Sequence, residues 1–458
     1  MTPNFADQAQ PSRPLHVVAA DNLDAWLAAQ PPEIATWLRD GGFRAALGEV
    51  MLLPGGSGSV AGAAIGLGTP ASRARQRFGL ARAVSSLPAG AWHFEGLPAD
   101  MATETALGWQ LAQYRFDRYR PADRTAPQLK CPEGVDEALV LAMAEGECLT
   151  RDLINTPAAD MGPAELEAAF LALADRFGAA TQVVQGPDLE EGFPMIHAVG
   201  KGSDRAPRLL SLRWGQTGPS LTLVGKGVCF DTGGLNLKPS SGMQLMKKDM
   251  GGAATVMGLA LMIMRLGLPI RLRVIVPAVE NSVSGRAMRP KDILRSRKGL
   301  TVEVNDTDAE GRLVLGDALA WAAEENPELL VSMATLTGAA RVAVGPDLAP
   351  YFTDDDSMAR ALEAGARAGA DPVWRLPFHT PYESVIEPGI ADLDNAPGFG
   401  FAGSITAALF LRRFADHPRY MHFDIYGHTP TDAPARPKGG VGQGARALLF
   451  ALPDMLGL

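Results

Sequence analysis

The chain has 458 residues, enough for two or three domains, and its 47% hydrophobic and 20% charged residues are ordinary for a globular protein. A net charge of −9 excludes a global basic field that would attract DNA or an anionic membrane. Three cysteines without a Cys-x-x-Cys pair exclude a disulfide framework and a thiolate zinc knuckle, and they indicate a reducing compartment.

No targeting or membrane segment is predicted. The N-terminus has no basic start followed by an apolar core, as a signal peptide would have. The longest apolar run, residues 253–266, is interrupted by Gly258 and Arg265. We therefore expect a cytoplasmic protein.

The first 120 residues mix short apolar stretches with turn-rich segments. Residues 56–61 form a nominal dinucleotide fingerprint, but no acidic residue follows in 71–90, so we interpret the stretch as a loop. Residues 120–134 hold three prolines and several charges, and they predict a linker.

Helices and strands alternate after this point. Apolar spacing predicts helices over 135–155 and 163–177, the first ended by Thr156-Pro157. Further strands are expected at 209–214, 221–225, 272–278 and 329–336, and further helices at 253–266, 315–325 and, after a turn at 440–444, 445–452. The alternation predicts a mainly parallel sheet covered on both faces, with the functional site at the carboxyl ends of its strands. Lys226, Asp308 and Thr335 lie where strands should end.

Residues 305–313, Asn-Asp-Thr-Asp-Ala-Glu-Gly-Arg-Leu, place three acids, a glycine and an arginine within seven positions of a mostly apolar region. In an extended chain Asp308 and Glu310 would point to one face, where they repel unless a cation or a proton lies between them. Arg312 would join that face and could hold an anion in its fixed fork. The segment predicts half of a metal site with an anion clamp.

Residues 223–252 supply the other half. Their charged residues are Lys226, Asp231, Lys238, Lys247, Lys248 and Asp249. With Asp308 and Glu310 the chain offers four carboxylates, which favour Mn, Mg, Ca or Zn in an oxygen-rich shell. Two ions bridged by shared carboxylates would use all four and would suit hydrolysis.

Other interpretations of these residues stay open. Asp249 could cap a helix that begins near Gly251, Asp231 could be a turn residue, and Glu310 and Arg312 could form an ordinary ion pair. Lys226 lies in no P-loop, and it could bind a metal only as the neutral amine.

Serine and histidine chemistry is disfavoured. Ser57 and Ser404 lack the Gly-x-Ser-x-Gly frame, and there is no His-Glu-x-x-His pair. His422, Asp424 and His428 lie in a stretch typical of a buried strand, so we interpret them as core residues.

These blocks resemble the leucyl aminopeptidase (cytosol aminopeptidase) family, peptidase family M17. NDTDAEGRL resembles the NTDAEGRL signature, and VGKGVCFDTGGLNLKPS…KKDMGGAA resembles the metal-binding stretch. PAVENSVSGRAMRPKDIL, ATLTGA and AGSITAALFLRRFA match further blocks in family order, over roughly residues 140–450. The resemblance implies an α/β fold. A catalytic domain (131–458) with a central, mainly parallel sheet flanked by helices would follow a smaller, divergent α/β domain with its linker (1–130).

The resemblance also implies roles for individual residues. The metal ligands would be Lys226, Asp231, Asp249, Asp308 and Glu310, with Asp231 and Glu310 bridging two ions. Lys226 and Asp249 would complete one metal site and Asp308 the other. The catalytic residues would be Lys238 and Arg312. The substrate would contact Met246, Asp306, Thr335, Leu336 and Gly338.

The implied activity is metal-dependent removal of a Leu-like N-terminal residue from peptides by water activated between two Mn or Zn ions. Lys238 would stabilise the oxyanion, and a bicarbonate on Arg312 would accept the proton. Family members form hexamers with sites facing an interior cavity, so a homohexamer is expected, without a membrane or nucleic-acid partner.

Two positions depart from the family pattern, since Asp306 replaces an Asn and Asn236 a Ser. The alternatives are a DNA-binding accessory protein and a catalytically silent paralogue. The acidic charge opposes the first, and the presence of all seven metal and catalytic positions opposes the second.

Overall fold

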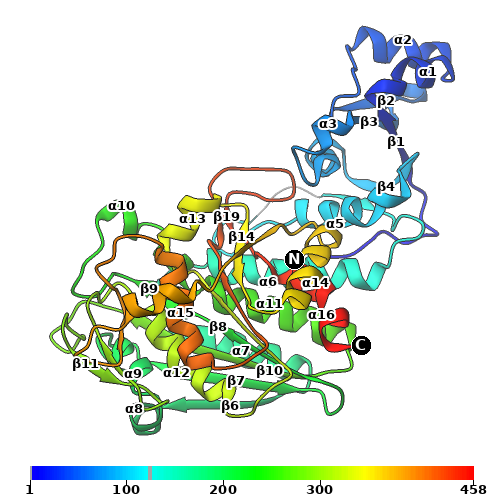
Figure 1. Ribbon diagram of the computed structural model, residues 1–458. Helices are drawn as coiled ribbons and strands as arrows, with labels where there is room; N and C mark the ends of the chain where they lie inside the picture. Colours follow the sequence, from blue (N-terminus) through cyan, green and yellow to red (C-terminus); the bar gives the residue numbers. More distant parts are fainter. Residues whose placement is uncertain (1–2, 122–125) are drawn as a thin grey trace. The chain divides into compact units, whose positions relative to one another are not determined.

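The computed structural model describes residues 3–121 and 126–458 (Figure 1). It divides into two compact units, Met1–Cys148 with Thr431–Lys438, and Leu149–Pro430 with Gly439–Leu458. The division falls within helix α6 (Glu137–Asn155), close to the helix predicted over 135–155.

The N-terminal unit is a five-stranded sheet with short helices. Its strands are β1 (Arg13–Ala19), β2 (Val50–Pro54), β3 (Val60–Gly68), β4 (Gly90–Glu95) and β5 (Pro127–Leu129), in the order β2-β3-β1-β4-β5. Its helices are α1 (Leu23–Ala28), α2 (Pro32–Asp40), α3 (Pro70–Arg73), α4 (Ala83–Ser86) and α5 (Ala102–Ala112). Leu15, Ile65, Trp92 and Trp109 are fully buried in its core.

The structure differs from the predicted linker. Residues 122–125 of that stretch lie outside the described residues, but 127–129 form β5, an edge strand parallel to β4. Pro127 is tolerated because it is the first residue of an edge strand. The loop predicted around Gly56 is confirmed as a single 3-10 turn, Gly56–Gly58, between β2 and β3.

A nine-stranded mixed sheet forms the centre of the second unit. Its strands are β6 (Ala180–Gln185), β7 (Arg208–Trp214), β8 (Ser220–Gly225), β9 (Gly227–Asp231), β10 (Arg271–Asn281), β13 (Leu329–Ala334), β14 (Ala349–Phe352), β15 (Val373–Leu376) and β17 (Tyr420–Asp424). The order is β15-β14-β17-β13-β8-β10-β7-β6, and β9 pairs with the end of β10. Five of the eight pairings are parallel, so the mainly parallel sheet is confirmed.

Helices and small strands surround this sheet. The helices are α7 (Pro163–Arg176), α8 (Pro187–Gly192), α9 (Pro194–Gly200), α10 (Ser240–Met243), α11 (Gly251–Leu266), α12 (Gly311–Ala323), α13 (Gly338–Val344), α14 (Asp356–Ala368), α15 (Gly403–Ala415) and α16 (Ala445–Leu456). The small strands are β11 (Ile293–Arg295), β12 (Thr301–Glu303), β16 (Leu393–Asp394), β18 (His428–Thr429) and β19 (Gly439–Gly440). Helices α11 and α12 both contact β8 and β13; α11 packs on α16, and α12 on α9 and α15. Two helical layers therefore cover the central strands.

Helix α11 is strongly apolar, with every residue from Gly251 to Met264 buried. The stretch Met246–Leu266 is long and apolar enough to cross a membrane by composition, yet 89% of its most apolar window is buried in the structure. A helix that is hydrophobic all round is typical of a core position, and here it packs against the sheet. The expected helix 315–325 begins four residues earlier, at Gly311, which places Arg312 in its first turn.

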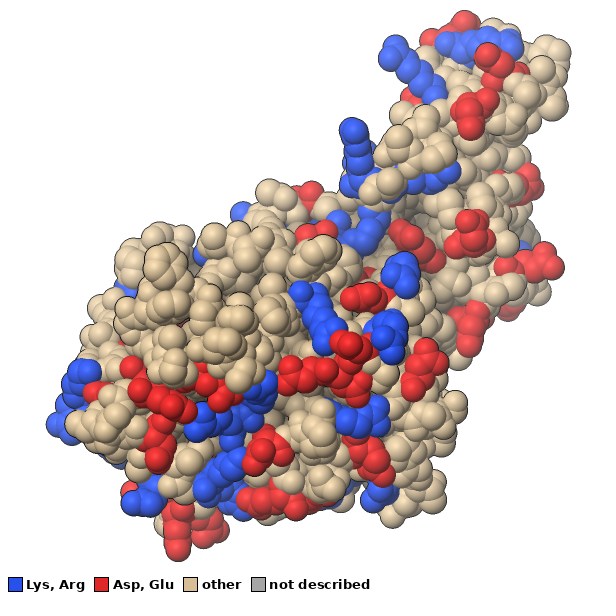
Figure 2. Space-filling model, viewed as in Figure 1, with Lys and Arg blue, Asp and Glu red and all other residues tan. Residues whose placement is uncertain are grey.

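In Figure 2 acidic and basic side chains are intermixed over the lower part of the second unit, whereas its upper left part shows few of them. Several form ion pairs, including Arg297–Glu324, Lys298–Asp416 and Arg412–Asp354. Surface pairs of this kind contribute little to stability. The apolar core around the central strands therefore provides most of it.

One buried carboxylate links three segments of this core. Asp317 of α12 accepts backbone N–H groups from Met195 (2.8 Å), Ile196 (3.4 Å) and Arg297 (2.8 Å). Asp317→Ala should lower the free energy of unfolding by about 3 kcal/mol, because buried donors lose their acceptor. Urea denaturation measures the loss, and Glu191→Ala on the surface is the control. Equal stability of the two variants would contradict this assignment.

Candidate metal centre

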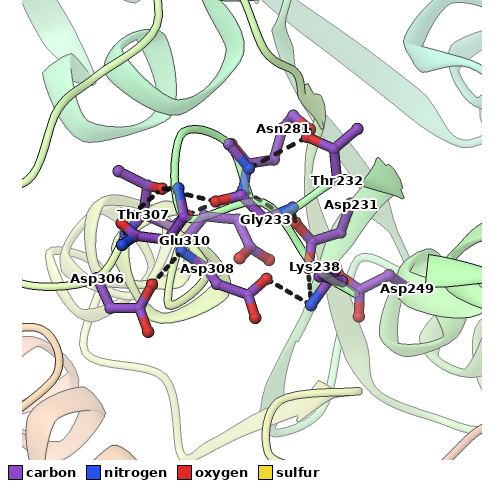
Figure 3. Close-up of polar contacts among 12 residues, drawn as sticks. Asp231, Thr232, Gly233, Lys238, Asp249, Asn281, Asp306, Thr307, Asp308 and Glu310 are labelled. Carbon is purple, nitrogen blue, oxygen red and sulfur yellow. Dashed lines mark hydrogen bonds and ion pairs between the residues drawn. The ribbon is translucent and has the colours of Figure 1, made fainter. Parts of the chain in front are cut away.

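The five residues proposed as metal ligands come from three segments, and two of them, Lys226 and Asp231, lie at the carboxyl ends of strands β8 and β9. Lys226 lies in the break between β8 and β9, and Asp231 ends β9. Asp249 lies in the 3-10 helix Met246–Met250 before α11, while Asp308 and Glu310 lie before α12. Ligand oxygens of Asp231, Asp308 and Glu310 lie within 4.8 Å of one another (Figure 3).

Two lysines contact the four carboxylates. The Nζ of Lys226 lies 2.7 Å from Asp249 Oδ2 and 2.9 Å from Glu310 Oε1, and it donates to the carbonyl oxygen of Thr335 at 3.0 Å. The Nζ of Lys238 lies 2.8 Å from Asp231 Oδ2 and also pairs with Asp308. Lys226 is buried, with only 3% of it exposed.

Negative charge exceeds positive charge in this cluster. Four carboxylates face two ammonium groups, which leaves two net negative charges when all six are ionised. Burial, and then the neighbouring Asp231, raise the pKa of Asp308 to about 7 and that of Glu310 well above its usual range. Burial alone would lower the pKa of Lys226, but the surrounding carboxylates raise it above its ordinary value. The cluster therefore favours added positive charge.

The buried carboxylate oxygens of the cluster have few donors among the described residues. Asp308 Oδ1 and Glu310 Oε1 contact the ammonium groups of Lys238 and Lys226, and Glu310 Oε2 has no hydrogen bond or ion pair from a described residue. Buried acceptors without a donor are costly unless a cation contacts them. Together with the amine of Lys226 they form an oxygen-rich donor set. The residues present therefore fit divalent cations such as Mn²⁺ or Zn²⁺.

Hydrogen bonds orient the ligands from behind. Asp231 Oδ1 accepts from the backbone N–H of Gly233 and from Asn281 Nδ2, both at 2.9 Å, which leaves Oδ2 directed into the cluster (Figure 3). Asn281 also donates to the carbonyl of Thr307 at 2.9 Å. One amide thus connects the β9 segment with the loop that carries Asp308, as outer hydrogen bonds do at metal sites.

A second link joins the same two loops. The backbone N–H of Asn236 donates to Thr307 Oγ1 (2.8 Å), and the N–H of Thr307 donates to Asn236 Oδ1 (2.9 Å). Thr307 Oγ1 donates to the carbonyl of Gly233 at 2.6 Å. The departure at Asn236 therefore contributes a reciprocal pair that holds the loops together.

Glycine is required where the chain passes closest to Lys226. A Cβ on Gly311 would lie 2.5 Å from Lys226 Cε and 2.6 Å from Nζ. Gly233, at φ +86°, adopts a conformation that favours glycine and approaches Asp308 Oδ1. These contacts explain two of the glycines in the blocks found by sequence analysis.

Two alternatives drawn from the sequence are wrong. Asp249 does not cap α11, because Met250 occupies the cap position and no side chain caps it; Asp249 Oδ1 instead accepts from Thr335 Oγ1 at 2.8 Å. Glu310 and Arg312 form no ion pair among the described residues. The expectation that Arg312 continues an extended face is also wrong, because Glu310 is already αR and Arg312 is helical.

Arg312 is nevertheless buried beside the cluster. Only 8% of it is exposed, and its Nε donates no hydrogen bond to any described residue. Burial lowers its pKa, against the charges of Asp424 and Glu310. An arginine with a free donor can hold a small anion.

The residues proposed to contact substrate lie around the cluster. Met246 begins the 3-10 helix that carries Asp249, and Gly338 begins α13. Thr335 is buried against Asp249, and Leu336 follows it. Asp306 Oδ1 accepts the backbone N–H of Asp308 at 2.8 Å (Figure 3), so its carboxylate shapes the turn before a proposed ligand.

Two features were missed or undervalued in the sequence. Asp424 is buried as expected of a core residue, but it accepts from the N–H groups of Leu336 and Thr337 and from the hydroxyls of Thr337 and Ser404, so it fixes the turn beside Thr335. Lys248 is 7% exposed and lies over the ring of Tyr426. No pattern in the sequence around Lys248 indicated that Tyr426 would be its partner.

Family models match most of the chain. The model described as the cytosol aminopeptidase family, catalytic domain, matches residues 148–449, and that of the M17 aminopeptidase N-terminal domain matches residues 13–132.

Similar proteins and structures agree with these matches. A probable cytosol aminopeptidase of Roseiflexus castenholzii is 40% identical over 380 residues, 79% of this chain and 78% of the relative. One of Chlorobium limicola is 34% identical over 461 residues, 91% of each chain. The crystal structure of cytosol aminopeptidase from Coxiella burnetii has a TM-score of 0.93 at 40% identity, covering 98% of both chains. The bottromycin maturation enzyme BotP in complex with Mn has a TM-score of 0.86 at 34% identity, covering 97% of this chain and 99% of its own.

The cluster predicts tight binding of divalent cations. Glu310→Gln keeps the size of the side chain but removes one charge and one ligand oxygen, so affinity for Mn²⁺ should fall roughly tenfold or more. Isothermal titration of metal-stripped protein measures it, with Glu191→Gln as control. An unchanged affinity of Glu310→Gln would show that the cation binds elsewhere.

Proposed function

The chain belongs to the cytosol aminopeptidase family, and from that premise we propose that it hydrolyses the N-terminal residue from peptides at a centre of two divalent ions, in the cytoplasm. That it is a metal-dependent aminopeptidase follows from the family. The two-ion centre and the residue roles are our proposal, and the buried cluster of four carboxylates with two lysines supports them most strongly.

The ligand assignment is the one that the family resemblance implies, and the contacts of Lys226 with Asp249 and Glu310 support it. Asp231 and Glu310 would bridge the ions, Lys226 and Asp249 would complete one position, and Asp308 the other. Bound there, the ions, Mn²⁺ or Zn²⁺, would polarise the scissile carbonyl and lower the pKa of a water molecule. Lys226 would bind as the neutral amine, having given up its proton when the cation arrives.

Two further residues would act on the substrate. Lys238, whose side chain is 13% exposed beside Asp231 and Asp308, would donate to the oxyanion that develops on the carbonyl. Arg312 would hold a bicarbonate with its free donor, and that anion would accept a proton from water. Thr335, Leu336, Gly338 and Met246 would surround the first residue of the peptide.

A homohexamer is proposed from the family. Large apolar side chains on the catalytic unit are exposed in the single chain, among them Val342 (82%), Phe401 (76%) and Ile390 (69%). Exposed apolar groups of this size favour burial against other copies.

Lys238→Ala should lower kcat on leucyl peptides by roughly a hundredfold or more, because an oxyanion donor is lost, while bound Mn²⁺ stays at the wild-type level. The assay uses metal-stripped protein before and after Mn²⁺ or Zn²⁺ is restored, with metal content measured in parallel. Lys298→Ala, a surface variant paired with Asp416, is the control. Wild-type protein without metal-dependent activity would refute the proposed function.

Asp306→Asn should keep activity, because the amide oxygen can still accept the N–H of Asp308, while metal preference or KM changes with the lost charge. Asp306→Ala removes the acceptor, so we expect it to lower Mn²⁺ affinity as well. Steady-state kinetics with Mn²⁺ and with Zn²⁺, and titration of both variants, test this pair. An inactive Asp306→Asn protein with full metal content would contradict the assignment.

A further inference from the structure

Two positively charged side chains contact one aromatic ring, next to the carboxylate cluster. The Nζ of Lys248 lies 4.9 Å from the centroid of the Tyr426 ring, and the guanidinium carbon of Arg341 lies 5.1 Å from the same centroid. Arg341 Nη1 also donates to the Tyr426 hydroxyl at 3.4 Å. The two positive charges are therefore within about 10 Å of each other.

Each cation lies on an element that carries a proposed substrate contact. Lys248 follows Met246 by two residues in the 3-10 helix Met246–Met250. Arg341 lies on α13, whose first residue is Gly338.

The aromatic ring lies next to another proposed contact. Tyr426 is followed by Gly427, which passes so close to Thr335 that a Cβ on this glycine would lie 3.1 Å from Thr335 Cγ2. Tyr426 itself is half-buried. The segment that carries the ring therefore packs against Thr335, one of the residues proposed to surround the first residue of the peptide.

No carboxylate among the described residues lies within ion-pair distance of Lys248 or Arg341. The neighbouring Asp249 is engaged elsewhere, with Lys226 and with the hydroxyl of Thr335. Lys248 is 7% exposed, and a contact with a tyrosine ring offsets only part of the cost of burying an ammonium group. Two cations without a carboxylate at ion-pair distance among the described residues favour a bound anion nearby.

The ring and α13 are held in place from behind. Gln443 Oε1 accepts the backbone N–H groups of Tyr426 (2.9 Å) and Gly427 (2.8 Å), and Gln443 Nε2 donates to the carbonyl of Pro346 (3.1 Å), just beyond α13. A cationic group on fixed elements is pre-organised for a ligand. Tyr426 adds an apolar surface for a short aliphatic stem.

Resting on the proposed aminopeptidase function, we propose that the pocket for the first residue accepts a carboxylate side chain, so that peptides with N-terminal glutamate or aspartate are substrates and Lys248 and Arg341 are specificity-determining residues. The carboxylate would lie between the two cations, with its stem on Tyr426. Glutamine has the same shape without the charge, so it should bind less well.

The test compares kcat/KM of the Mn²⁺-loaded enzyme on glutamyl, glutaminyl and leucyl p-nitroanilides. These substrates have no terminal carboxylate, so the glutamyl side chain supplies the only anion. We expect glutamyl to exceed glutaminyl by roughly tenfold or more, mainly through KM, and the ratio to shrink as salt is added. If the enzyme cleaves the leucyl substrate but its kcat/KM for the glutamyl substrate is no higher than for the glutaminyl substrate, this inference is overturned while the proposed function stands. Failure to cleave any of the three would overturn the proposed function.

Variants of the two cationic residues test whether they cause the preference for the glutamyl substrate. Arg341→Gln and Lys248→Met should each lower the glutamyl-to-glutaminyl ratio roughly tenfold, with the change in KM. Arg360→Gln, an exposed arginine on α14, is the matched control and should keep the wild-type ratio. Because Lys248 is buried, circular dichroism is used to check that Lys248→Met protein folds. Arg341 is exposed, so Arg341→Gln protein tests the assignment if Lys248→Met protein does not fold. A wild-type ratio in folded Arg341→Gln protein would overturn the assignment.

Discussion

The structure of the catalytic unit depends on the concentration of four carboxylates at one buried point. Such a group cannot stay ionised without positive charge, and the chain supplies Lys226 and Lys238 in direct contact with it. The remaining imbalance, together with Glu310 Oε2, which is buried without a hydrogen bond or ion pair from a described residue, makes a divalent cation the natural complement. The local backbone makes room for this arrangement. Lys226 lies in the break between β8 and β9, and Gly311 leaves space for the side chain of Lys226.

A mainly parallel sheet suits this task because it brings the ends of distant segments to one edge. Lys226 and Asp231 flank β9, Thr335 follows β13, and Asp424 ends β17. Each of these strands is fixed by backbone pairing over its length, so its end is positioned with little freedom. The apolar helix α11 packs against the same strands and begins directly after Asp249.

Around the carboxylate cluster, buried polar side chains set the geometry. Asn281 and Thr307 connect the loop after β9 with the loop before α12, and Asp424 holds the turn at Leu336 and Thr337. Beyond them, Lys248, Arg341 and Tyr426 add charge and an aromatic surface beside the proposed pocket. In our proposal, the excess negative charge at the centre would bind cations, and the positive charge of Lys248 and Arg341 would bind an anionic side chain beside it.

The sequence by itself determined the family, the α/β class and the candidate ligands. The reason is that Lys226, Asp231 and Asp249 lie close together in one segment, and Asp308 and Glu310 in another, so short-range pattern is sufficient. It also predicted α6, α7, α11 and the central strands, whose apolar spacing reflects burial. It misread residues 127–129 as part of a linker, because pairing with β4 is a non-local interaction that overrides prolines and charges. It placed Arg312 on an extended face, because it located the start of α12 four residues too late.

Only the tertiary structure decided which partners complete the site. Asn281 is 50 residues from Asp231, and Tyr426 lies far along the chain from both Lys248 and Arg341. No local pattern encodes these contacts, because sheet order and loop approach determine them. Asp249 is another example. Its sequence neighbours suited a helix cap, but in the folded chain the approach of distant segments brings it into contact with Lys226 and Thr335.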